Sequence, residues 1–99
     1  MEFATAVLGA PLVVVIGHSS CGAVNAAFDK PPGLPEKLQK VINNIVPGIE
    51  GSADKLAATK ANTETVVCNV KKNPVIQSQN TQVVGGYYDF ATGVVTFYE

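Results

Sequence analysis

The sequence predicts an α/β fold in which a small sheet of about three strands packs with helices. Leu12–Ile16 is an uninterrupted apolar run with four β-branched residues, typical of a parallel strand that is covered on both faces. Helix-period segments follow it, as expected for the crossover between two parallel strands. Two further apolar segments, Thr81–Phe90 and Val94–Tyr98, flank Ala91-Thr92-Gly93, which predicts a carboxy-terminal antiparallel hairpin.

The remaining elements are expected to be helices. Four are predicted, over residues 2–9, 22–28, 35–46 and 54–72. Pro47-Gly48 is expected to end the third helix, and Pro74 closes the fourth before a short apolar segment, Val75-Ile76. Helices, one parallel pair of strands and a hairpin together give a single domain over residues 1–99.

Charge and composition exclude several classes of function. A formal net charge of −1 gives no basic surface for nucleic acid or an anionic membrane. All seven basic residues are lysines, so no guanidinium can clamp phosphate or bicarbonate. The apolar run Ala4–Gly17 is too short to span a bilayer, and Met1-Glu2-Phe3 lacks the basic start of a secretory signal. We expect a cytoplasmic protein whose two cysteines are free thiols or metal ligands.

The turn after the first strand carries the only histidine, His18, and one cysteine, Cys21. At this i, i+3 spacing an imidazole and a thiolate can converge in front of the next helix, whose amino end favours the thiolate. Sulfur and imidazole form a zinc-type ligand pair, although a complete site needs three or four protein ligands. A structural cysteine beside a hydrogen-bonded histidine and a Cys–His nucleophile pair remain open alternatives. The missing arginine excludes a phosphatase-type anion loop.

Four other residues have mainly structural interpretations. Cys68 lies mid-helix among valines, which favours core packing over metal ligation. Asp89 is a candidate partner for a metal ligand, but its place before a turn favours a turn-stabilising carboxylate. Tyr87 and Tyr88 point to opposite faces of a strand, so we expect one in the core and the other at the surface.

The segment Gly17-His18-Ser19-Ser20-Cys21-Gly22-Ala23-Val24 resembles the second zinc-ligand motif of the β-class carbonic anhydrases. Similarity to this family continues over nearly the whole chain, through Glu2-Phe3-Ala4, the residues near Pro74-Val75-Ile76, and the two segments 85–89 and 92–95. The resemblance implies zinc as the cofactor, with His18 and Cys21 as ligands. It also implies that Gly22 lets the turn close, and it assigns no residue as a catalytic base.

The family also has an earlier Cys-x-Asp-x-Arg segment, which supplies a third zinc ligand and an Asp–Arg pair, and this sequence has no counterpart of it. The resemblance therefore implies an amino-terminally truncated domain. In the family, the strand of that segment lies beside the strand predicted here at Leu12–Ile16, which would become an open edge that favours association. We expect a homodimer at least, paired through this strand or through the exposed helix faces. The partner chain, or water and an exogenous ligand, is expected to complete the zinc shell.

The activity implied by the resemblance is the reversible hydration of carbon dioxide to bicarbonate. Two alternatives stay open. One is a zinc-binding or structural homologue with little or no hydratase activity. The other is a related zinc hydrolase that acts on carbonyl sulfide or carbon disulfide.

Overall fold

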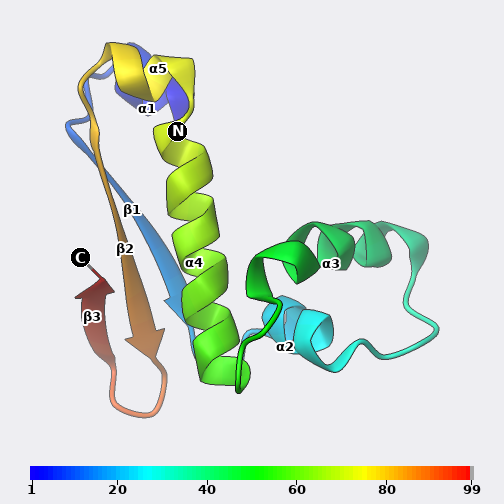
Figure 1. Ribbon diagram of the computed structural model, residues 1–99. Coiled ribbons are helices and arrows are strands. Elements are labelled where there is room, and N and C mark those ends of the chain that lie inside the picture. The colour runs from blue at the N-terminus through cyan, green and yellow to red at the C-terminus, as the bar shows by residue number, and fades with distance from the viewer. Residues whose placement is uncertain (99) are drawn as a thin grey trace.

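A three-stranded mixed sheet with helices forms the structure, a computed structural model that describes residues 1–98 (Figure 1). In chain order the elements are α1 (Glu2–Ala6), β1 (Leu12–His18), α2 (Gly22–Asp29), α3 (Glu36–Ile49), α4 (Lys55–Lys71), α5 (Pro74–Ser78), β2 (Gln82–Asp89) and β3 (Val94–Tyr98). β1 pairs in parallel with β2, and β2 pairs antiparallel with β3. The predicted α/β class, parallel pair and terminal hairpin are confirmed, and β1 lies at one edge of the sheet.

One face of the sheet is covered by α4, the only described helix that packs on β1 and β2 (Figure 1). Glycines allow the close approach: a Cβ atom on Gly17 would collide with Thr63 Oγ1, and one on Gly85 would lie 3.3 Å from Thr63 Cγ2. The buried Thr63 hydroxyl donates to the carbonyl of Thr59 at 2.9 Å, so it needs no partner in the sheet. Thr59, Thr63 and Val67 of α4 thus approach the strands at their glycines.

The opposite face of the sheet is uncovered by the described helices. Along β1, Leu12, Val14 and Ile16 are 49%, 37% and 48% exposed, whereas the residues between them are half-buried. On β3, Val95 and Phe97 lie on the same face and are also exposed. The expectation that β1 is covered on both faces is therefore wrong for this chain, because a single helix covers the sheet and the strand side chains alternate between its faces. We call Leu12, Val14, Ile16, Val95 and Phe97 the open face.

The hydrophobic core lies among α2, α3 and the first turns of α4, on the side of α4 away from the sheet (Figure 1). It consists of Val24, Ala27, Ile42, Ile49 and Ala58. The predicted helix end at Pro47-Gly48 is wrong, because α3 continues through Pro47 and buries Ile49 in this core. Burial of an isoleucine stabilises by about 1.5–3 kcal/mol, which offsets much of the cost of a proline within a helix.

The shorter helices lie at the end of the sheet where β1 begins (Figure 1). α1 ends at Ala6 rather than near Gly9, and the apolar segment after Pro74 is itself a helical turn, α5, which contacts α1. Within residues 1–98, no helix has the length and apolar character needed to cross a membrane.

Candidate metal centre

The turn that joins β1 to α2 positions both predicted zinc ligands. His18 is the last residue of β1, and Cys21 is the N-cap of α2. The chain reverses at Ser20, whose φ of 56° lies in the left-handed region. Gly22 has no positive φ, and a Cβ there would meet open space. The expectation that Gly22 lets the turn close is therefore wrong, because Ser20 makes the reversal.

The His18 ring has a defined orientation at the carboxyl end of β1. Its Nδ1 lies 2.9 Å from the carbonyl oxygen of Ser19. Because a carbonyl oxygen can only accept, this contact assigns the proton to Nδ1, and Nε2 is then the acceptor nitrogen of the Nδ1–H tautomer. Metal-binding histidines commonly donate their second ring nitrogen to a carbonyl in this way. Strand alternation places His18 on the same side of the sheet as the open face.

Residues at and just after the end of β2 lie beside this histidine. Tyr88 is the register partner of His18, and its carbonyl accepts a hydrogen bond from the Ser19 N–H at 3.0 Å. The Ser19 Oγ accepts from the Phe90 N–H at 2.9 Å. The ring of Phe90 lies 5.1 Å from the imidazole at an interplanar angle of 44°, and Tyr88 meets Phe90 edge-on at 5.2 Å. Residues from two ends of the chain therefore contact the predicted ligand.

Cys21 is a free, half-buried thiol that packs against the core cluster. Its side chain makes no capping hydrogen bond to α2, so the sulfur has no structural partner of that kind. An imidazole nitrogen and a thiolate sulfur are both donor types that suit zinc. Among residues 1–98 there is no group of three or more His, Cys, Asp or Glu side chains that could hold a metal. His18 and Cys21 are therefore two predicted ligands in one turn, with no third such side chain grouped with them among residues 1–98.

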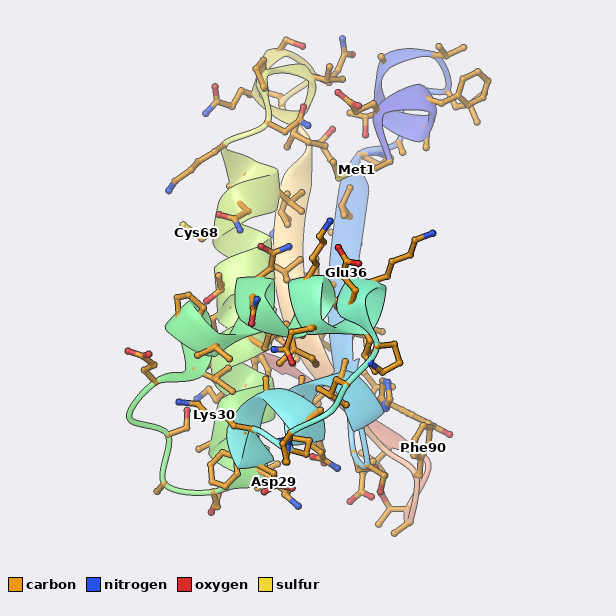
Figure 2. The ribbon with its side chains drawn as sticks, turned by 90° about the vertical axis from the view of Figure 1, so that its right-hand side faces the viewer. Met1, Asp29, Lys30, Glu36, Cys68 and Phe90 are labelled. Carbon is orange, nitrogen blue, oxygen red and sulfur yellow. The ribbon has the colours of Figure 1, made fainter. Side chains whose placement is uncertain are left out.

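The second cysteine is far from this turn. Cys68 is exposed, so the expectation of core packing is wrong. The row of α4 that faces the sheet consists of Thr59, Thr63 and Val67, and Cys68 is one residue past that row. Figure 2 places Cys68 toward the far end of α4 from the hairpin, where Phe90 lies.

The remaining candidates near the hairpin have structural roles. Asp89 Oδ1 accepts from the Ala91 N–H at 2.9 Å, which confirms the turn-stabilising interpretation. Tyr87 and Tyr88 are both half-buried, so the expected division into core and surface is wrong. Tyr87 lines a hollow on the α4 side, whereas Tyr88 packs against Phe90 on the uncovered side.

Two hollows adjoin this end of the molecule. The larger, of about 560 Å³, lies between α4 and the hairpin; Lys60 Nζ there lies 5.3 Å from the centre of the Tyr98 ring. Burial raises the pKa of the Tyr98 hydroxyl, with smaller contributions from Tyr87 and Glu64. A smaller hollow of about 250 Å³ is lined by Ser19 and Ser20 but not by His18 or Cys21. The candidate metal ligands therefore do not line either hollow.

Comparison with known proteins identifies the family of this chain. A sequence model described as carbonic anhydrase matches residues 1–95. The chain belongs to the β-carbonic anhydrase family. The β-carbonic anhydrase CcaA superposes over 100% of this chain and 52% of its own, with a TM-score of 0.81 at 26% identity. A chain from the crystal structures of two tetrameric β-carbonic anhydrases of Sordaria macrospora shares the fold, with a TM-score of 0.81 at 20% identity over 97% of this chain and 56% of that chain.

Curated sequences agree with this assignment to the carbonic anhydrase family. A carbonic anhydrase from Mycolicibacterium smegmatis is 30% identical over 108 residues, which cover 96% of this chain and 52% of that protein. Carbonic anhydrase 2 from Mycobacterium tuberculosis is 67% identical over 28 residues, or 28% of this chain and 14% of that protein. The chain thus spans about half the length of the M. smegmatis relative and of CcaA. The predicted resemblance to β-carbonic anhydrases is confirmed.

Proposed function

We propose that the protein binds zinc through His18 Nε2 and Cys21 Sγ and takes part in the reversible hydration of carbon dioxide to bicarbonate. The observation that carries this proposal is the turn itself. It has an imidazole with a free Nε2 at the end of β1 and an unengaged thiol at the start of α2, in a chain of the carbonic anhydrase family. When bound, zinc supplies the Lewis acidity that makes water a nucleophile near neutral pH.

The roles of the protein residues in this proposal are to bind and to orient. Cys21 provides a soft sulfur donor at the N-cap of α2. His18 provides an imidazole donor whose Nδ1 faces the Ser19 carbonyl, which leaves Nε2 for the metal. We assign no general base within residues 1–98.

The proposed zinc shell needs further ligands, and we propose that self-association contributes to completing it. β1 is an edge strand, and His18 lies on the same side of the sheet as the exposed Leu12, Val14 and Ile16. A second copy that covered this side would bury apolar surface and approach the His18 ring. Water or an exogenous ligand would fill any remaining position.

Stopped-flow measurement of carbon dioxide hydration tests the activity. We expect zinc-loaded protein to exceed the buffer rate, and His18→Ala to lower the zinc-dependent rate by more than about 100-fold, because loss of a ligand should exceed the 10–100-fold cost typical of losing an outer-shell partner. Zinc binding with a rate equal to buffer would instead support a zinc-binding homologue without hydratase activity. Parallel assays with carbonyl sulfide and carbon disulfide, monitored by sulfide release, test the related hydrolase.

Sedimentation velocity tests the association surface. We expect a dimer at micromolar concentration that Ile16→Lys converts to a monomer, because a buried unpaired ammonium costs several kcal/mol. The matched control is Val41→Lys on α3, since Val41 is 49% exposed and Ile16 48%. A monomeric native protein, or equal effects of the two substitutions, would contradict association through the open face.

A further inference from the structure

All three polar groups of Ser19 are hydrogen-bonded, and two of them connect β1 to the end of β2. Its N–H donates to the Tyr88 carbonyl at 3.0 Å, and its Oγ accepts from the Phe90 N–H at 2.9 Å. Its carbonyl accepts from His18 Nδ1 at 2.9 Å. The carbonyl oxygen that orients the His18 imidazole therefore belongs to a residue whose N–H and Oγ are also hydrogen-bonded. A shift of Ser19 would move the acceptor away from the ring.

Phe90 restrains the same imidazole from another direction. The residue is 58% exposed, yet its ring centre lies 5.1 Å from that of His18 and meets the Tyr88 ring edge-on. Phe90 occupies the hairpin end of the sheet (Figure 2). The turn that carries it is closed by the Asp89 carbonyl, which accepts from the Gly93 N–H at 2.8 Å. The position of the Phe90 ring therefore follows the position of the hairpin.

We propose that Ser19 and Phe90 form a latch that holds the His18 imidazole in the Nδ1–H tautomer and in a fixed orientation, with Nε2 left free for the metal. Both are positioning residues, since neither supplies a donor atom to the proposed zinc site. This inference rests on the proposed function of His18 as a metal ligand. It adds that the carboxy-terminal hairpin, 71 residues away in sequence from Ser19, controls the affinity of the site for metal.

The direct test is the tautomer of His18 in metal-free protein, measured from the two ring nitrogen chemical shifts at about pH 8, where an ordinary histidine is neutral. We expect the Nδ1–H form in the native protein and a mixture enriched in Nε2–H in Ser19→Ala and in Phe90→Leu. Ser19→Thr keeps the hydroxyl and should restore the native form. Ser78→Ala is the control, because its hydroxyl bonds Val75 on α5, away from the site.

Cobalt affinity, measured by competition with a chromophoric chelator, provides the second readout. We expect Ser19→Ala to weaken cobalt binding by about 10-fold or more, as is typical of lost outer-shell support, with rescue in Ser19→Thr. A native tautomer and native affinity in both Ser19→Ala and Phe90→Leu would overturn the latch. If Ser19→Ala does not fold, Phe90→Leu decides alone, because it keeps the backbone bonds.

The two readouts separate the latch from the proposed function. If the native protein binds no cobalt, the proposed metal site fails, but the ring shifts still decide whether Ser19 and Phe90 set the tautomer. If cobalt binds and the variants leave both the ring shifts and the affinity unchanged, the metal site stands and the latch fails.

Discussion

Cys21→Ser is expected to lower the zinc affinity of the protein by more than about 100-fold. Loss of an outer-shell partner already costs 10–100-fold, and a serine hydroxyl is a poor replacement for a thiolate donor at neutral pH. The half-buried Cys21 side chain caps nothing, so the substitution removes the donor while retaining the shape of the turn. Competition with a chromophoric chelator measures the affinity. Cobalt substitution adds a specific signal, since the thiolate charge-transfer band should disappear.

The second cysteine offers a matched control for this experiment. Cys68→Ser changes the same chemical group at an exposed position on α4, and it should leave both affinity and the cobalt spectrum unchanged. His18→Ala should lower affinity as strongly as Cys21→Ser. Equal affinities in the Cys21→Ser variant and the native protein would show that the turn is not the metal site. A selective effect of Cys68→Ser would move the site to α4.

Features of the fold that depend on local pattern could be predicted from the sequence. The apolar run at Leu12–Ile16 and the turn at Ala91-Thr92-Gly93 specify their strands through neighbouring residues alone. The exposure of Leu12, Val14 and Ile16 could not be predicted in this way. A continuous apolar run looks the same whether one face of the strand is covered or two, and only the helices packed on the sheet decide it.

The helix faces show a second limit of sequence pattern. The sheet-facing row of α4 contains Thr59 and Thr63, whose hydroxyls bond carbonyls within the helix, so no apolar periodicity marks this row. The valines near Cys68 therefore led to the wrong prediction that the face of α4 that carries Cys68 is buried. Pro47 likewise looked like a helix end because the burial of Ile49 is a tertiary effect.

The candidate site could be predicted only in part, because only some of its contacts are local in sequence. His18 and Cys21 belong to one short turn, so their proximity in the chain could be read directly. The contacts of Ser19 and Phe90 depend on the parallel register that sets His18 opposite Tyr88. Register between segments so distant in sequence is set by the packed sheet, and a serine beside a histidine carries no signal of it.

Gly17→Ala is expected to destabilise the protein by about 1–3 kcal/mol, because the added methyl overpacks the contact between β1 and α4. Its Cβ would collide with the Thr63 hydroxyl, which is committed to the Thr59 carbonyl, and would also press on the Thr59 side chain. Thermal unfolding followed by circular dichroism should show the loss, at about 4–8 °C per kcal/mol for a chain of this size.

Two further variants make this stability prediction specific. Gly22→Ala adds a methyl where nothing lies within 4 Å, so it should be neutral or stabilise α2 by up to about 1 kcal/mol. Combining Gly17→Ala with Thr63→Ala removes the colliding hydroxyl, so the double variant should lose less stability than the sum of the single changes. Strict additivity, or equal stability of Gly17→Ala and Gly22→Ala, would contradict the close approach of β1 to α4. Gly17 directly precedes His18. The close approach of β1 to α4 that Gly17 and Thr63 permit therefore also sets the position of the His18 imidazole at the start of the turn.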